Sequence, residues 1–478
     1  MNIFLLLLFL NYEILESNAY KASIINWEPV PAYTVDAAMM KSSEKILKTF
    51  NLNEEKSDIY IFPEYTYTNK NYFDLIYRPW NFGFDVPEES EKSLCDDSFE
   101  GNKYLKELSC AAKKEEIYVV VHVIENGPDT LYNTILVFNR EGSLQKKHRK
   151  INLSNYEKRY FTPGNTFTTF TTDFNVEFSL LTSEDIFLYN EENHPSKTDV
   201  ILCSSMYAWM PFLNLVSLFD GFSKKYQRNL LAATTNSKTY DYPGASGFYG
   251  MNNDKVQYYT EQYYIIHNKI ETHIPKDQCE NAEKPLTGIL AIKPTVDVRT
   301  EFDSSEYWNY QLHQLKNGKN NFQLTTDDKK IVCEFKVTLN EKQENYNAAL
   351  AYSSGKYYGC AIVACKTGEM KSCGGIVKSN ANEMSDVEIH TKFADIDIER
   401  FNYPVSLNTE LEPIGEYTYC TNKNGITLKS KGPLTEMLTL GYYGNGPQGK
   451  NSGSYVKASL LTATFIVLNL FKFLCYES

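Results

Sequence analysis

The most informative stretch of this sequence is Phe178-Ser-Leu-Leu-Thr-Ser183-Glu-Asp-Ile-Phe187. Residues 178–182 have the pattern of a buried strand, and the strand stops abruptly at a short run of polar side chains. A strand that ends on a sharp polar turn is where an α/β enzyme presents a nucleophilic serine or cysteine. Ser183 is therefore a candidate nucleophile. Many strands end in Thr-Ser, so the interpretation depends on the rest of the chain.

Two other stretches place a reactive side chain just after a strand. Ile59-Tyr-Ile-Phe-Pro-Glu64-Tyr ends a short apolar strand on a glutamate. Tyr132-Asn-Thr-Ile-Leu-Val-Phe and the later His148-Arg-Lys150-Ile-Asn-Leu153 form a strand pair that ends on a lysine. This order of motifs resembles the carbon–nitrogen hydrolase (nitrilase) superfamily. The resemblance is closest to its vanin and biotinidase branch, and residues 207–210 and 244–250 also look like vanin sequences at matching distances.

The resemblance implies a role for each of these residues in splitting an amide. In the family a glutamate is the base, a lysine steadies the oxyanion, and a cysteine is the nucleophile. Glu64 and Lys150 match the first two roles by position, whereas Ser183 stands where the family has its cysteine. Glu157 is a candidate for the second glutamate that some members place near the lysine. The resemblance implies no cofactor and no metal.

The choice of Lys150 depends on register. It ends the run Lys146-Lys-His-Arg-Lys150, and runs of like charge are usually solvated. Only the motif residues before and after the run favour Lys150 over Lys147. The simpler interpretation of Glu64 is a solvated carboxylate at a strand end. The preceding Pro63 and the order of the later motifs argue against that interpretation.

Ser183 is a departure from the family that bears directly on catalysis. A cysteine thiol has a pKa of about 8.5, so a carboxylate with a lysine nearby can hold it partly as thiolate. A serine hydroxyl is far less acidic, and serine enzymes use histidine or lysine as the base. The sequence offers no histidine near Ser183, and Cys203 falls on the wrong strand by motif order. The sequence therefore predicts a site whose residues come together but whose nucleophile is not activated.

Three functions remain open on the sequence alone. The first is a catalytically impaired vanin-like pseudoenzyme that binds a small amide-bearing molecule or a protein in the inherited pocket. The second is an active amidohydrolase on a pantetheine- or biotinamide-like substrate, which uses Ser183 or another nucleophile. The third is a surface interaction protein with a vestigial pocket.

Length, composition and charge limit the class of protein. A chain of 478 residues fits two or three domains. Its 42% hydrophobic content, with 14% aromatic residues, is ample for a large core, so the chain is not a disordered protein. The net charge of -12 argues against nucleic acid or an anionic membrane surface as a partner, because either would repel the protein.

The order of expected elements predicts two domains of different class. Strands rich in β-branched residues alternate with helices expected at residues 35–50, 102–115 and about 212–226, which is typical of an α/β sheet covered by helices. The resemblance implies the family's α-β-β-α sandwich over residues 20–300. Short strands, turns and most of the cysteines predict a smaller, disulfide-bearing β-rich domain over residues 301–444, similar to the vanin C-terminal domain.

The N-terminal segment has the features of a secretory signal. Residues 3–10 are apolar, and Ser17 and Ala19 have the spacing of a signal-peptidase site. The prediction is a signal peptide over residues 1–19, with Tyr20 as the first mature residue.

The C-terminal segment has the features of a lipid-anchor signal. Residues 458–471 are apolar, yet they fall short of the about 20 residues that a spanning helix needs. Small residues upstream make Gly444, Asn445 or Ser452 a candidate attachment site. The prediction is a GPI-attachment signal over residues 445–478 and a protein anchored in the outer leaflet of the plasma membrane. A C-terminal membrane helix is the alternative.

Cysteine usage fits an extracellular chain. Of the ten cysteines, Cys203 is expected as a free buried thiol in a strand, and Cys475 lies in the C-terminal tail. The other eight allow too many pairings to be assigned, apart from the local pair Cys95 and Cys110. An extracellular setting and the lack of an adjacent histidine disfavour zinc at Cys360, Cys365 and Cys373.

One glycosylation sequon is present, Asn152-Leu-Ser154. It predicts a glycan on Asn152 beside the candidate site, with a buried and unmodified asparagine as the alternative.

Overall fold

The computed structural model divides the chain into two compact units, Met1–Asp277 with Tyr403–Gly415, and Gln278–Asn402 with Glu416–Ser478. It describes residues 19–51, 56–68, 78–190, 198–206, 215–236 and 244–250, the short strands at 257–259, 265–270, 290–291 and 296–303, and, with brief gaps, residues 306–445. The expected signal peptide, residues 207–210, Cys279 and nearly all of the expected anchor signal lie outside the described residues.

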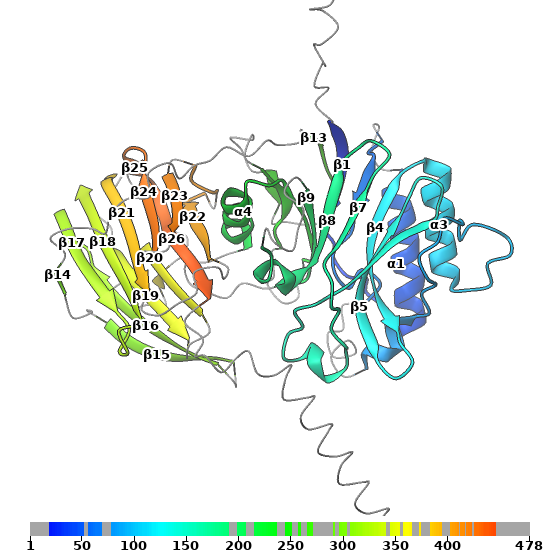
Figure 1. Ribbon diagram of the computed structural model, residues 1–478, viewed down its shortest axis with the longest axis horizontal. Helices are drawn as coiled ribbons and strands as arrows, with labels where there is room; N and C mark the ends of the chain where they lie inside the picture. Colours follow the sequence, from blue (N-terminus) through cyan, green and yellow to red (C-terminus); the bar gives the residue numbers. More distant parts are fainter. Residues whose placement is uncertain are drawn as a thin grey trace, which may run out of the picture. The chain divides into compact units, whose positions relative to one another are not determined.

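The first unit contains two mixed β-sheets (Figure 1). One has the order β13-β1-β2-β4-β5-β6, with β3 beside β4, and its strands β1, β2 and β4 run parallel. The other has the order β12-β11-β10-β9-β8-β7, and its strands β8, β9 and β10 run parallel. The bounds in the first sheet are β1 (Tyr20–Ile25), β2 (Ile59–Ile61), β3 (Gly83–Phe84), β4 (Tyr118–Asn126), β5 (Leu131–Phe138), β6 (Leu144–Arg149) and β13 (Ile265–Ile270). Those in the second are β7 (Thr168–Thr171), β8 (Glu177–Thr182), β9 (Asp199–Ser204), β10 (Leu230–Thr234), β11 (Ser246–Tyr249) and β12 (Gln257–Tyr259).

Among the described residues, three α-helices cover the outer faces of these sheets. Helices α1 (Val35–Thr49) and α3 (Lys103–Glu115) pack on the first sheet, and α4 (Leu215–Tyr226) packs on β10 and β11 of the second. Helix α1 begins at Thr34, whose hydroxyl accepts the amide of Ala37, and Asn102 caps α3 in the same way. The disulfide expected between Cys95 and Cys110 ties α3 to the preceding loop.

The alternation of side chains along each strand creates two cores. On β4, Val119 and Val121 face the helices, whereas Val120 faces the other sheet. The layer between the sheets is made of fully buried aliphatic side chains, each worth about 1.5–3 kcal/mol of hydrophobic stabilisation; they include Ile24, Ile61, Leu180, Ile201 and Leu231. The four layers confirm the α-β-β-α sandwich.

A late segment of the chain belongs to the first unit. Residues 403–415 lie there, and Tyr403, on β22 (Asn402–Asn408), packs its ring against Phe222 and Tyr226 of α4. The Tyr403 hydroxyl donates a hydrogen bond to the carbonyl oxygen of Ile186. Because residues so far along the chain join the first unit, the two compact units are not a simple N- and C-terminal division.

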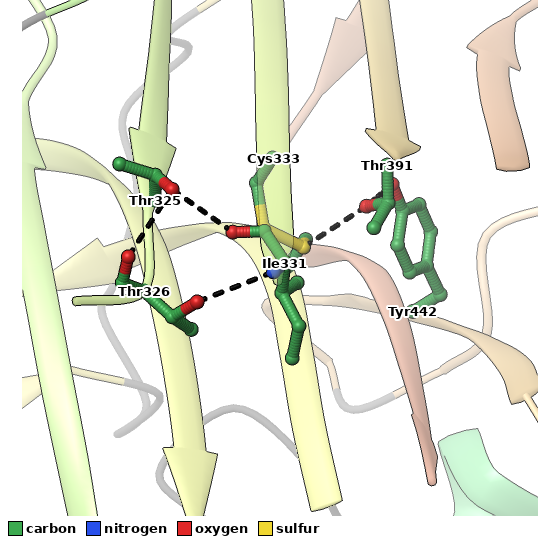
Figure 2. The surroundings of a disulfide bond; sticks show 7 residues. Thr325, Thr326, Ile331, Cys333, Thr391 and Tyr442 are labelled. Atoms are coloured by element: carbon green, nitrogen blue, oxygen red, sulfur yellow. Dashed lines mark hydrogen bonds between the residues drawn. A yellow bond between two sulfur atoms is a disulfide. The ribbon is translucent and has the colours of Figure 1, made fainter. Parts of the chain in front are cut away.

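The second unit is β-rich and disulfide-bonded, as expected. One sheet has the order β14-β17-β18-β21-β24-β23, with β25 beside β21, and a second contains β15-β16-β19-β20-β26. The Cys333–Cys360 disulfide joins β18 of one sheet to β20 of the other (Figure 2). Cys365 pairs with Cys373. The bounds are β14 (Leu290–Ala291), β15 (Val296–Asp303), β16 (Glu306–Gln314), β17 (Gly318–Thr325), β18 (Ile331–Asn340), β19 (Asn345–Ser353), β20 (Tyr357–Cys365), β21 (Glu383–Phe393), β23 (Tyr417–Asn422), β24 (Gly425–Ser430), β25 (Leu434–Thr435) and β26 (Met437–Asn445).

Candidate active site

The side chains of Glu64, Lys150 and Ser183 meet at one end of the parallel strands. Glu64 follows β2, Lys150 follows β6 of the same sheet, and Ser183 follows β8 of the opposite sheet. The Ser183 hydroxyl donates to Glu64 Oε2 at 2.6 Å, and Lys150 Nζ lies 3.1 Å from Glu64 Oε1. All three residues are at most 2% exposed. Lys147, the other lysine considered, instead pairs with Glu88 and Glu125.

Ser183 sits on a strained turn between a strand and a helical turn. Its φ of 41° lies in the left-handed region, which residues with a Cβ rarely adopt. The 3-10 turn η3 (Ser183–Phe187) begins there, and the Asp185 side chain accepts the amide of Thr182 in a capping box. Asp185 also accepts the amides of Ile151 and Asn152, which ties this turn to the segment after Lys150. The strain and the capping together present the Ser183 hydroxyl to Glu64.

Glu64 is buried but held as a carboxylate. Its Oε1 also accepts from Asn133 Nδ2 at 2.7 Å, and its Oε2 accepts the Ser205 amide at 3.1 Å and the Ser205 hydroxyl. Burial by itself raises the pKa of Glu64, but the Lys150 ammonium, the nearby His122 and the two serine hydroxyls outweigh it and lower the pKa to about 2. Glu64 is therefore ionised and strongly solvated by the protein at neutral pH.

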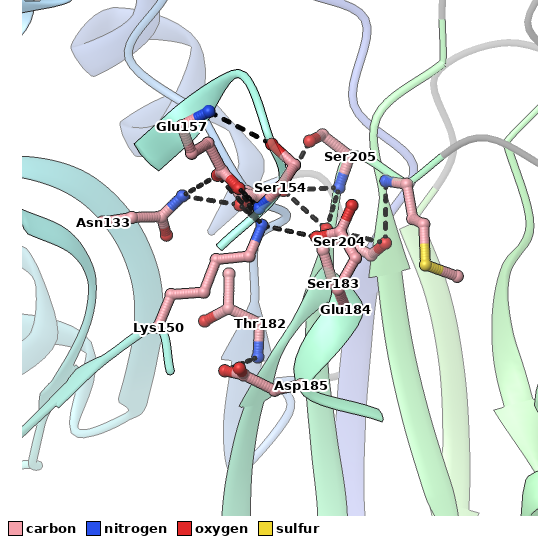
Figure 3. A network of polar contacts seen from close by, with 12 residues as sticks. Asn133, Lys150, Ser154, Glu157, Thr182, Ser183, Glu184, Asp185, Ser204 and Ser205 are labelled. Atoms are coloured by element: carbon pink, nitrogen blue, oxygen red, sulfur yellow. Dashed lines mark hydrogen bonds and ion pairs between the residues drawn. The ribbon is translucent and has the colours of Figure 1, made fainter. Parts of the chain in front are cut away.

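Lys150 is surrounded by three carboxylates, and Figure 3 labels two of them, Glu157 and Glu184. Its Nζ lies 2.8 Å from Glu157 Oε2 and 2.6 Å from Glu184 Oε2, in addition to the contact with Glu64. Burial alone lowers the pKa of Lys150, but the charges of Glu184, Glu64 and Glu157 together raise it well above its usual value. The candidate second glutamate, Glu157 of η2 (Glu157–Arg159), is thus in direct contact with the lysine.

Glu184 differs from the other carboxylates of the site. Its side chain is 29% exposed, although the Oε2 atom that faces Lys150 is buried. Burial raises the pKa of Glu184 to about 7, with Lys150 opposing the rise and the negative charges of Glu157 and Glu64 adding to it. The charge of Glu184 therefore changes near neutral pH, whereas Glu64 stays ionised there.

Sequence reasoning did not single out several residues of this network. Asn133 donates to both Glu64 and Glu157, and the Tyr65 hydroxyl donates to Glu157 at 2.8 Å. Asn133 lies in the motif that begins at Tyr132, and Glu184 directly follows Ser183, so their positions in the sequence could have indicated both residues. Ser205, just past β9, had none, because its distance from Glu64 depends on how the two sheets pack.

Two histidines lie in the surroundings, which corrects the expectation that none would be near. His122 of β4 bonds to Asn133 and accepts the Tyr65 amide, and burial lowers its pKa. His148 of β6 lies 3.1 Å from Asp185. Among the described residues, Ser183 forms its side-chain hydrogen bonds with Glu64, Ser204 and Ser205, and none of these is a histidine. Both histidines therefore support neighbouring residues instead of serving as a base for Ser183.

Cys203 and Asn152 are the remaining residues that the sequence analysis considered near the site. Cys203 is a free, fully buried thiol in the layer between the sheets, and burial raises its pKa well above the usual value, so it is unsuited to act as a nucleophile. The Asn152 side-chain amide donates to the Glu184 carbonyl oxygen at 2.7 Å, and Asn152 is half-buried. Glycosylation of Asn152 stays a prediction. A glycan would be attached to the same side-chain nitrogen that donates this hydrogen bond.

In the described part of the chain, no group of three or more histidine, cysteine, aspartate or glutamate side chains could hold a metal ion. No helix among the same residues is both long and apolar enough to cross a membrane.

Chemically, the arrangement combines a carboxylate, an ammonium and a hydroxyl where an amide hydrolase needs a base, an oxyanion donor and a nucleophile.

Comparison with known proteins identifies two family models that match this chain. Residues 29–191 match the carbon-nitrogen hydrolase family model, and residues 300–448 match the vanin C-terminal domain model.

Curated relatives extend over most of the chain. Vanin-like protein 3 of Drosophila melanogaster is 22% identical over 90% of this chain and 89% of its own length. The pantetheinase of Mus musculus is 25% identical over 76% of this chain and 73% of its own. Among solved structures, Nit3 of Saccharomyces cerevisiae, a member of branch 10 of the nitrilase superfamily, aligns with a TM-score of 0.43 and 17% identity over 53% of this chain and 90% of its own. The two family matches in this order, together with the relatives that span both, place the chain: it belongs to the vanin branch of the carbon–nitrogen hydrolase (nitrilase) superfamily.

Proposed function

We propose that this protein is a vanin-like pseudoenzyme whose pocket binds a small amide-bearing molecule and whose amide hydrolysis is impaired at the nucleophile. The observation that supports the proposal is the hydrogen bond from the Ser183 hydroxyl to Glu64, a carboxylate whose pKa is about 2. The geometry is that of a nucleophile and its base, but the base is too weak for a hydroxyl.

The size of the pKa mismatch between the hydroxyl and the carboxylate supports an inactive site over a slow enzyme. A serine hydroxyl resembles water, for which the pKa is about 16. Proton transfer to a carboxylate with a pKa of about 2 is then uphill by about 14 pKa units, or roughly 19 kcal/mol. A turnover of about one per second allows a total barrier of only about 17 kcal/mol. A thiol with a pKa of about 8.5 reduces the uphill step to roughly 9 kcal/mol.

The test is to restore the thiol. Ser183→Cys should gain hydrolysis of pantetheine- or biotin-type amides, because Glu64 can ionise a thiol and Lys150 can contact the oxyanion. Loss of an activated nucleophile costs up to about a million-fold in turnover, so partial recovery is measurable. The matched control is Ser183→Cys combined with Glu64→Gln, which should lose the gain. A folded Ser183→Cys variant that stays inert on these amides contradicts the proposal.

An active amidohydrolase is the second candidate. The arrangement of the site favours this candidate. Lys150 contacts both Glu64 and Glu157, and Ser183 has the strained backbone of a nucleophile held at a strand end. The curated relatives that are named pantetheinase make a pantetheine-like amide the substrate to try first. Wild-type turnover that disappears in Ser183→Ala would support this candidate, and turnover that survives that change would place the nucleophile elsewhere.

A vestigial pocket is the third candidate. Any ligand that binds the native state must raise its melting temperature by mass action. A wild-type protein that no small amide stabilises would favour a function carried by its outer surface.

We further propose that the protein acts at the extracellular face of the plasma membrane, held by a lipid anchor attached near Gly444, Asn445 or Ser452. The sequence features at both chain ends and the three disulfides among the described residues support a secretory route.

A further inference from the structure

The ammonium of Lys150 is enclosed by carboxylates that compete with any ligand for its hydrogens. A lysine side chain offers three N–H donors and no more. Glu64, Glu157 and Glu184 all lie within 3.1 Å of Lys150 Nζ, so three carboxylates share three donors. An oxyanion can therefore be stabilised by Lys150 only if one of these carboxylates gives up its contact.

The surroundings of the three carboxylates differ in how firmly each is held. Glu64 accepts further hydrogen bonds from Asn133, Ser183 and Ser205. Glu157 accepts from Tyr65, Asn133 and the Ser154 amide. Glu184 Oε2, in contrast, has no hydrogen-bond partner besides its ion pair with Lys150 among the described residues, and its side chain is 29% exposed. Glu184 is the partner that can leave at the lowest cost.

From this geometry we infer that Glu184 is a gating residue: its ion pair withholds Lys150 from anionic oxygens, and the pocket accepts such an oxygen once Glu184 is protonated or displaced. Glu184 would act through Lys150, as a positioning residue, without touching the substrate. The inference rests on the proposed function, because it concerns the same pocket, and it adds a pH-dependent control to that pocket.

Protonation of Glu184 is accessible in the neutral range, since its pKa is raised to about 7. It is protonated in about nine molecules of ten at pH 6 and in about one of ten at pH 8. If only the protonated form admits an anion, the apparent affinity falls by about tenfold between these pH values. Among the described residues, the other charged or titratable groups around this ion pair include Glu64, Glu157, Tyr65, Asp185, His122 and His148, so the test must isolate Glu184 from them.

The test measures anion binding directly and does not require turnover. Butyrate, a short carboxylate whose oxygens can reach an ammonium, is titrated calorimetrically at pH 6 and pH 8 into the full chain with Ser183 intact. Wild type should bind about tenfold more weakly at pH 8. Glu184→Gln, and Glu184→Ala as a second variant, should bind at pH 8 as tightly as wild type does at pH 6 and should lose the pH dependence. Glu177→Gln, a half-buried glutamate on β8, is the matched control and should behave as wild type.

Two results would overturn the inference. One is a tenfold loss of affinity that persists in Glu184→Gln, which would assign the titration to another group. The other is the absence of butyrate binding to both Glu184 variants at either pH, which would mean that Lys150 is not released. Because Ser183 is unchanged, these results are independent of the Ser183→Cys experiment, and failure of one leaves the other interpretable.

Discussion

Replacing Lys150 by methionine tests the central feature of the site, a buried cation that neutralises three carboxylates. The change preserves most of the side-chain volume but leaves Glu64, Glu157 and Glu184 without their shared counter-ion. Breaking a buried ion pair from one side costs about 3–5 kcal/mol, because the remaining charge stays buried. Here the upper part of that range is expected at pH 7, since Glu64 and Glu157 are both nearly inaccessible to water.

Scanning calorimetry is the suitable assay, because the two compact units need not unfold in one transition. For a unit of this size 1 kcal/mol shifts the melting temperature by about 2–4 °C, so a cost of about 4–5 kcal/mol should lower the transition of the first unit by about 8–20 °C. The deficit should shrink as the pH is lowered towards 4, because the orphaned carboxylates then take up protons.

Lys146→Met provides the control within the same basic run. Lys146 pairs with Glu89 at the surface, with both side chains more than a third exposed, and such pairs contribute about 0–1 kcal/mol. The reasoning is refuted if Lys150→Met and Lys146→Met melt within about 2 °C of each other, or if the deficit of Lys150→Met does not change with pH.

Two further predictions concern acid stability and attachment. The pKa of Glu64 is lowered to about 2 in the folded protein, so its contribution to stability is complete above its ordinary pKa of 4.5 and is lost as the pH falls towards 2. Between pH 5 and pH 2.5 the free energy of unfolding of wild type should therefore fall by roughly 2 kcal/mol more than that of Glu64→Gln, which is measured as a shrinking difference between their melting temperatures. A difference that stays constant would show that Glu64 is not held as the carboxylate. Phosphatidylinositol-specific phospholipase should release the mature protein from cells that express it, and retention after treatment would favour a membrane helix at residues 458–471.

Much of the fold could be predicted from local sequence patterns. The helix expected at residues 35–50 is α1, and the helix expected at residues 102–115 is α3 with Asn102 as its cap. These predictions succeed because amphipathic spacing, caps and β-branched runs act within a few residues. Near the end of the second unit the extended backbone is divided into β25 and β26, because Glu436 between them has a left-handed φ of 52° that local sequence patterns do not reveal.

The sequence by itself determined the class of the two domains and the three side chains that follow strands β2, β6 and β8, because each of those signals lies within one short segment. Only the tertiary structure decided how these side chains are used. The contact of Glu184 with Lys150, the hydrogen bonds of Ser205 to Glu64 and the inclusion of residues 403–415 in the first unit all join segments far apart in the chain. Burial and the distances between charges set the charge state of Glu64 and Glu184, and both depend on how the two sheets pack against each other.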